Sequence, residues 1–243
     1  MRLRVPALAA ALVVGAVLAT GPAASADAPV ATYEVTIADL TGGQPLTPPL
    51  VATHSAATGL FSVGQPASFE LKEIAENGNL GPMIARLESD KHVADVAAAE
   101  APLVPHGLPG SAMFGDKVTL TVTASHGAQL LSFASMLICT NDGFTGVDSL
   151  RLPKEVGDVV TVEPAAYDAG TEHNTEDFAD IVPPCQGLVG VSSGEPGTAT
   201  SNPALAEGGV IHHHPGIVGG ADLVPAIHGW TDPVARVTVT RTS

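Results

Sequence analysis

The sequence has few aromatic side chains and, after its first twenty residues, no long apolar run. Aromatic residues make up 4% of the 243 residues, so the core must be built mainly from valine, leucine, isoleucine and alanine. Glycine (26) and proline (20) are frequent, and both interrupt regular structure. These features predict a globular chain of short elements and many turns, without a membrane-spanning segment in the mature protein.

The N-terminus has the pattern of an export signal. Two arginines precede the apolar run Val5–Thr20, and the small residues Ala24–Ala26 follow it. This order of a basic, an apolar and a small-residue segment is typical of a secretory signal peptide. We therefore predict a signal peptide at 1–26, cleaved after Ala26, and a single exported domain at 27–243.

Basic residues are scarce in the predicted mature chain. Ten Lys and Arg less Arg2 and Arg4, which leave with the signal peptide, are eight, against 25 Asp and Glu, giving a formal charge of −17. Such a surface repels the phosphates of nucleic acid. It also disfavours anionic lipid unless a metal ion bridges the two.

The common catalytic motifs are absent. The sequence has no Gly-x-Ser-x-Gly, no His-Glu-x-x-His, no phosphate-binding glycine loop and no dinucleotide fingerprint. Few aromatic side chains remain to stack against a sugar ring, as a glycosidase would need. We expect a binding module rather than an enzyme.

The chain has two cysteines, Cys139 and Cys185. An even number in an exported protein favours a disulfide, which would hold the flanking segments in register. The alternative is a pair of buried free thiols.

Two acidic segments lie on either side of a strand-like run. Their acids are Asp142 and Asp148 in residues 140–150, and Asp168 and Glu172 in residues 167–172. Hard divalent cations such as Ca²⁺ take six to eight oxygen ligands, which separate glycine-containing loops can supply. The alternative is that these acids cap turns in solvent, and Asp148 in particular suits a capping or supporting role.

A second possible metal site is the run His212–His214. Alternate histidines of an extended chain lie on one face, so His212 and His214 could bind Zn²⁺ or Cu²⁺ with His54 or His228. This would suit a secreted metal-dependent enzyme, the alternative function. Without a third ligand these are surface or structural histidines.

Alternation of apolar and polar residues predicts an antiparallel β-sandwich, an all-β fold with one or two short helices. Residues 92–101 are ambiguous, residues 192–206 read as an exposed loop, and the lone Trp230 as a core or rim anchor or, if exposed, a partner contact. The predicted strands are Tyr33–Leu40, an edge strand at Val51–His54, Val118–Thr123, Leu130–Ile138, Val159–Val162 and Val234–Thr240. The predicted helices are a segment opened by Pro66–Ser68 and ended by Asn77–Gly78, and a second one at Pro82–Ser89.

Three segments together resemble the spondin N-terminal domain, the module of F-spondin and mindin. They are Ser132–Leu137, Asn141–Leu150 and Tyr167–Glu172. Weaker similarity extends to the first strand and to Ala235–Val239. The order, spacing and glycine placement carry the resemblance.

The resemblance implies a C2-like sandwich that holds one Ca²⁺ in loops at one end and serves recognition or adhesion. The implied ligands are Asp142, Asp168 and Glu172. The chain departs from the animal pattern at Gly143, which separates the first acid from the aromatic residue, and at Glu172, which replaces an aspartate. The sequence leaves the partner open among an extracellular or envelope protein, a glycan and a lipid.

Overall fold

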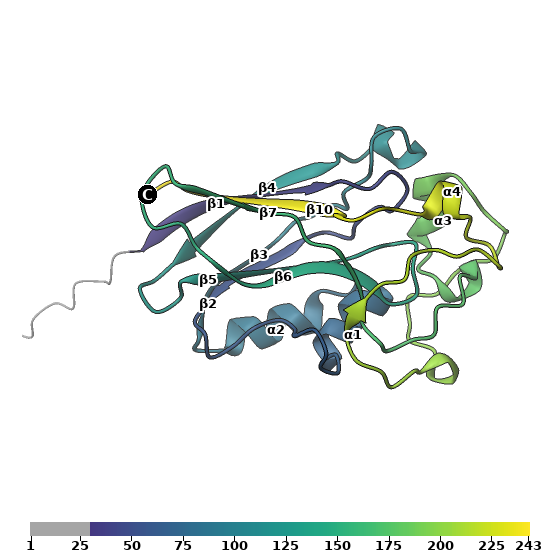
Figure 1. The fold of residues 1–243 in the computed structure, drawn as a ribbon, viewed down its shortest axis with the longest axis horizontal. Coiled ribbons are helices and arrows are strands. Elements are labelled where there is room, and N and C mark those ends of the chain that lie inside the picture. The colour runs from purple at the N-terminus through teal and green to yellow at the C-terminus, as the bar shows by residue number, and fades with distance from the viewer. Residues whose placement is uncertain (1–29) are drawn as a thin grey trace, which may run out of the picture.

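The computed structural model describes residues 30–243 and forms a sandwich of two antiparallel sheets, as predicted. The four-stranded sheet has the order β4-β1-β10-β7, and the six-stranded sheet has the order β3-β2-β5-β6-β8-β9 (Figure 1). The predicted signal peptide lies outside the described residues. The strands are β1 (Ala31–Asp39), β2 (Leu50–His54), β3 (Val93–Ala98), β4 (Lys117–Ala124), β5 (Leu130–Met136), β6 (Gly143–Arg151), β7 (Val159–Val162), β8 (Ala166–Asp168), β9 (His212–His213) and β10 (Ala235–Arg241).

The central strand β1 shows why alternation predicted the sandwich. Tyr33, Val35 and Ile37 are fully buried between the sheets, whereas the residues between them reach the outer face. Strand β1 pairs antiparallel with β10, with Tyr33 opposite Arg241. The start of β1 and the end of β10 therefore lie at the same end of the sandwich, on the left in Figure 1.

Helices α1 (Phe69–Asn77) and α2 (Gly81–Ser89) cover the outer face of the six-stranded sheet as a third layer (Figure 1). The Ser68 hydroxyl accepts a hydrogen bond from the Leu71 N–H at 3.2 Å and so begins α1. Gly78 ends it with a left-handed φ of 63°. Buried Leu71 and Ile74 then pack on the sheet.

The predicted edge strand at Val51–His54 is instead internal. All five residues of β2 are buried, because β2 lies between β3 and β5 and carries α1 and α2 on its outer side. Its neighbour β3 came from the ambiguous segment 92–101. Alanine-rich composition did not distinguish strand from helix there, and pairing with β2 determined the outcome.

Residues 140–150 are not one loop, as the sequence suggested. Only the first of them form a turn, and β6 begins at Gly143. The glycine at 146 serves close packing inside this strand rather than a turn: a Cβ there would lie 2.6 Å from the Phe133 carbonyl oxygen and 2.8 Å from the Phe61 ring. Asp148 is therefore a strand residue.

We call the opposite end of the sandwich, formed by residues 139–142 and 169–233, the loop end. It contains α3 (Pro184–Val189) and α4 (Pro225–His228) and lies on the right in Figure 1. The predicted disulfide is confirmed: Cys139 and Cys185 are bonded and fully buried, and they join the turn before β6 to α3. None of the helices within residues 30–243 combines the length and apolarity needed to cross a bilayer.

Candidate metal centre

Asp142 occupies the last position of the turn before β6 and is fully buried. Its Oδ2 accepts hydrogen bonds from the Thr171 N–H at 2.7 Å, the Glu172 N–H at 3.0 Å and the Thr171 hydroxyl at 3.2 Å. Its Oδ1 is buried and has no hydrogen-bond partner among the described residues. Oδ2 of this carboxylate thus has three hydrogen-bond donors, whereas Oδ1 has none among the described residues.

Asp168 lies beside Asp142 because it ends the neighbouring strand. Strand β8 pairs with β6, with Asp168 opposite Gly143, and the Ala169 N–H donates to the Asp142 carbonyl at 3.2 Å. The Asp168 carboxylate accepts from the Gly170 N–H at 2.8 Å and from the Asn174 amide at 2.7 Å. Two buried carboxylates, one from the turn before β6 and one from the end of β8, therefore lie close together at the loop end.

This arrangement changes the acidity of Asp142. Burial, and secondly the negative charge of Asp168, raise the pKa of Asp142 to about 7, although three donated hydrogen bonds act in the opposite direction. At neutral pH this carboxyl is therefore partly protonated. An unpaired anionic oxygen inside the protein is costly unless a proton or a cation compensates it.

Of the three predicted ligands, Glu172 has the side chain with the weakest connection to the Asp142–Asp168 pair. Its main-chain N–H belongs to the site, since it binds Asp142. Burial raises the pKa of its carboxyl to about 7, and the charge that acts most strongly on that carboxyl is Glu76 on α1, ahead of Asp142. The Glu172 carboxyl is thus influenced by Glu76 on α1 more strongly than by Asp142.

The remaining ligands of any cation would have to come from other oxygens. Among residues 30–243, no three His, Cys, Asp or Glu side chains gather as a ready-made metal site. Calcium, however, also accepts main-chain and amide carbonyl oxygens and water. Asn174, which sequence reasoning missed, holds Asp168 through its amide nitrogen and has an amide oxygen on the same group. The polar run after Glu172 was the only signal for it.

Asp148 does not support the acidic loop, because its hydrogen bonds hold another segment of the chain. Its Oδ1 accepts from the Leu60 N–H at 2.8 Å and the Ser132 hydroxyl at 3.2 Å, and its Oδ2 from the Ser149 hydroxyl at 3.0 Å. These bonds hold the segment after β2 against β6. Asp148 stabilises the sandwich away from the Asp142–Asp168 pair.

Replacing Asp148 by alanine should lower stability without touching the metal centre. Losing a carboxylate that accepts three hydrogen bonds costs about 2–3 kcal/mol, because three donors lose their partner. Thermal melts of the D148A variant should show a lower Tm by similar amounts with and without Ca²⁺. A selective loss of any calcium effect would contradict this assignment.

The structure also pairs a serine with a histidine. His54 Nε2 lies 2.7 Å from the Ser132 hydroxyl, a distance that would suit a nucleophile and its base. Both side chains are fully buried. The pair therefore connects β2 to β5 on the face of the six-stranded sheet that α1 and α2 cover.

The three consecutive histidines have three different surroundings. His212 is exposed, with Nε2 3.8 Å from Asp168 Oδ1, and His213 is bonded to Asp232. His214 is buried, accepts from the Gly216 N–H at 3.0 Å and packs edge-on against Trp230. Burial lowers the pKa of His214 to about 4. Of the three, His212 lies beside the candidate metal centre.

A family model described as Spondin_N matches residues 44–179, more than half of the chain. The chain belongs to the spondin N-terminal domain family. The matched range contains Asp142, Asp168 and Glu172, and this family consists of extracellular-type modules. No curated protein sequence matches the chain.

The family match is narrower than the resemblance expected from the sequence. It begins after β1 and ends before β10, so the strands at the two ends of the chain lie outside it. It also ends before α3 and α4. The Asp142–Asp168 pair of this spondin domain thus lies within the matched range, whereas α3, α4 and the rest of the loop end after residue 179 lie outside it.

Proposed function

We propose that this spondin domain is an exported calcium-binding recognition module without catalytic activity. The observation that carries the proposal is the buried, unpartnered Oδ1 of Asp142 beside the carboxylate of Asp168. A Ca²⁺ ion there would supply the missing compensation and relieve the repulsion between the two acids. Glu172 would complete the ligand set by turning its carboxylate from Glu76 toward the ion.

The ion would join segments that are otherwise connected only by hydrogen bonds. Asp142 belongs to the turn before β6, and Asp168 precedes the irregular chain that forms most of the loop end. Fixing their relative position would order the surface that this chain presents to a partner. Export follows from the signal-peptide pattern of residues 1–26 and agrees with the extracellular nature of the family.

Calcium should raise the melting temperature of the protein at pH 7.5. A ligand at 100 times its Kd stabilises the folded state by about 2.7 kcal/mol, which shifts the Tm of a domain this size by about 5–10 °C. The D142N variant should melt no lower than the wild type in EGTA, since its amide is neutral, and should lose the calcium shift. Scanning calorimetry with millimolar CaCl₂ or EGTA measures both.

Glu207→Gln is the matched control for this experiment. Glu207 is an exposed acid of the same loop end, so its removal tests general electrostatics while leaving the Asp142–Asp168 pair intact. The control should keep the full calcium shift. An identical melting temperature of the wild type in CaCl₂ and EGTA, or a shift that survives D142N, would refute the proposed site.

The approach of His212 to Asp168 supports one alternative, a Zn²⁺ or Cu²⁺ centre in a secreted metal-dependent enzyme. Elemental analysis of protein purified without chelator separates the two functions. Stoichiometric calcium would support the recognition module. Stoichiometric zinc or copper that is lost in the H212A variant would favour the enzyme.

A further inference from the structure

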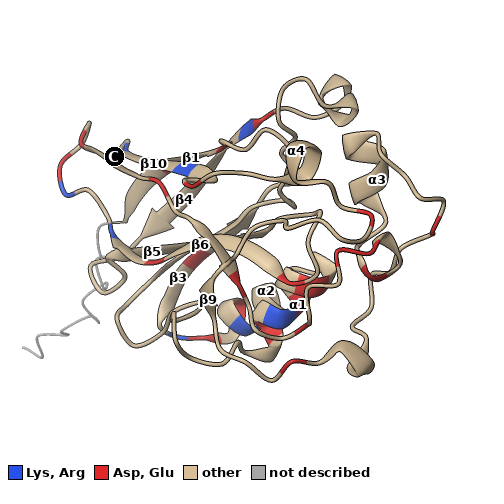
Figure 2. Ribbon diagram, turned by 45° about the vertical axis from the view of Figure 1, so that its right-hand side comes forward, with Lys and Arg blue, Asp and Glu red and all other residues tan. Residues whose placement is uncertain are grey.

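The loop end has the strongest excess of acidic over basic residues in the molecule. Between Glu163 and Arg236 the sequence contains nine Asp or Glu residues and no Lys or Arg. Figure 2 shows the result: red segments lie on the loops around α3, whereas the blue segments lie elsewhere on the molecule. A surface of one sign attracts partners of the opposite sign and repels those of its own.

The same end exposes aliphatic side chains. Val218 is 76% exposed, and Val224 and Ile227 are each 40% exposed. The two segments that carry them adjoin, because a Cβ on Gly219 would lie 3.0 Å from Pro225 Cδ. We call Val218, Val224 and Ile227 the aliphatic patch. Aliphatic residues grouped on a charged surface are typical of an interaction site rather than of scattered exposure.

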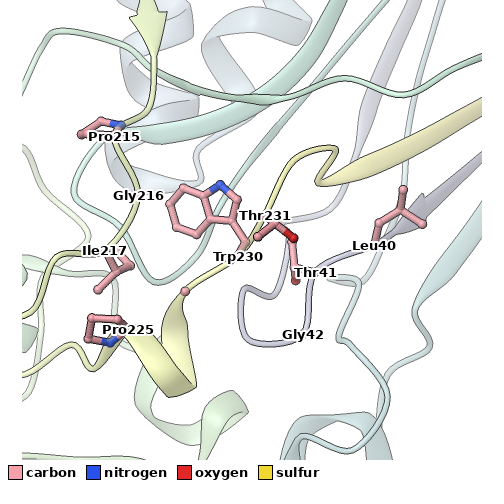
Figure 3. Close-up of a pocket in the computed structure, with 10 residues that line it drawn as sticks. Leu40, Thr41, Gly42, Pro215, Gly216, Ile217, Pro225, Trp230 and Thr231 are labelled. Atoms are coloured by element: carbon pink, nitrogen blue, oxygen red, sulfur yellow. The ribbon is translucent and has the colours of Figure 1, made fainter.

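A pocket of about 500 Å³ opens beside this patch (Figure 3). Trp230, Ile217 and Pro225 form its apolar side, and Thr41 and Thr231 provide hydroxyl groups. None of the described residues that line it is charged. An indole beside neutral polar groups suits a long basic side chain, whose methylene stem packs on apolar walls while its cation lies against the ring.

We propose that the loop end docks a basic segment of a partner protein, with one arginine or lysine side chain against Trp230 and an apolar neighbour on the aliphatic patch. The inference rests on the proposed recognition function and names its class of partner. Charge complementarity selects this occupant, since the six of these acids that are not buried would repel an anionic bilayer or a nucleic acid. The aliphatic patch and the pocket fix the position of the docked segment, which charge attraction alone does not do.

A short peptide tests the proposal directly. The probe is a capped pentapeptide of glycine, arginine, leucine, arginine and glycine, and its counterpart carries citrulline, which is uncharged and nearly isosteric, in place of arginine. Trp230 is the single tryptophan of the chain, so its fluorescence reports the pocket. We expect saturable quenching by the arginine peptide, at least tenfold weaker binding of the citrulline peptide, and weaker binding as NaCl rises from 50 to 500 mM.

Two variants locate the binding surface by calorimetry. I227S should weaken binding of the arginine peptide by about fivefold, and W230F by at least as much, because phenylalanine keeps the packing but is a poorer cation-binding ring. Val156→Ser is the matched control: Val156 is 65% exposed, and its neighbour Gly157 bonds to Arg241 at the opposite end. This control should bind as the wild type does.

The proposal is overturned if both peptides bind equally, if I227S and W230F bind as the wild type does, or if phosphatidylserine vesicles bind and the arginine peptide does not. Each titration is run in CaCl₂ and in EGTA. Peptide binding without any calcium shift in the melting experiment would leave this inference standing while refuting the metal centre. A calcium shift without peptide binding would do the reverse.

Discussion

The variant C139A/C185A is expected to be less stable than the wild type by about 4 kcal/mol and to melt about 10 °C lower. The disulfide closes a loop over a sequence separation of 46, so its loss restores considerable conformational freedom to the unfolded chain. Urea unfolding and scanning calorimetry under oxidising conditions measure the two quantities. This is the largest effect that we expect from a change outside the sheets.

The wild type in reductant provides the control. Both sulfur atoms are buried, so reductant should act during unfolding and bring the melting temperature of the wild type close to that of the variant. The variant itself should not respond to reductant. Because the loop contains Asp142 and Asp168, the variant should also bind calcium more weakly. Equal stability of the oxidised wild type and the variant would show that the bond constrains little.

Asp39 should make the protein less stable as pH rises. Burial, with a smaller contribution from the charge of Asp116, raises the pKa of Asp39 from 3.8 to about 8. Its Oδ1 accepts from the Thr41 N–H at 2.8 Å, but its Oδ2 is buried without a partner among the described residues. The folded state therefore keeps this proton over a pH range in which the unfolded state has lost it.

The sign of the pH dependence follows from that difference. A folded-state pKa above the unfolded value favours folding at low pH, and this contribution is lost between pH 4 and 8 at about 1.4 kcal/mol per pH unit, levelling above pH 8. The D39N variant has a neutral amide at every pH and should lack this slope. It should resemble the wild type near pH 4.5 and exceed its stability by several kcal/mol at pH 8, as an order of magnitude.

Urea unfolding of both proteins in EGTA, from pH 4.5 to 8.5, isolates this residue. Other shifted groups, including Asp142 and Glu172, titrate in both proteins and cancel in the difference between the two curves. Parallel curves across the whole range would mean that Asp39 is ionised at little cost. That outcome would require a partner for its second oxygen.

Elements controlled by local chemistry could be predicted from the sequence. Strict alternation in β1 and β4 gave strands whose apolar residues face the core. The opening segment Pro66–Ser68 and the ending Asn77–Gly78 predicted helix α1 within three residues of its observed bounds. In each case the signal and its structural effect lie within a few residues of one another.

Elements controlled by tertiary packing could not be predicted from the sequence. Strand β6 was read as part of a loop, because Gly143 and Gly146 look like turn residues although Gly146 makes room for Phe133 and Phe61. Strand β3 is alanine-rich and depends on β2 for its conformation. Neither Phe61 nor β2 is near these segments in the sequence.

The candidate metal centre likewise has one part that the sequence predicted and another that it did not. The position of Asp142 beside Asp168 follows from the pairing of β6 with β8, as the family resemblance implied. The influence of Glu76 on Glu172 depends on where α1 packs, and the bond from Asn174 depends on the course of the chain after β8. Composition and motif spacing carry no information on either.

The pairing of β1 with β10 determines how this molecule can be held. Because Tyr33 and Arg241 face each other, a tether attached to the start of β1 or to the end of β10 would hold the domain at the end opposite the loop end. The loop end, which contains α3 and α4, then points away from the tether (Figure 1). The point of attachment and the loop end thus lie at opposite ends of the long axis. A domain immobilised through β1 or β10 on a solid support would therefore keep its loop end unobstructed.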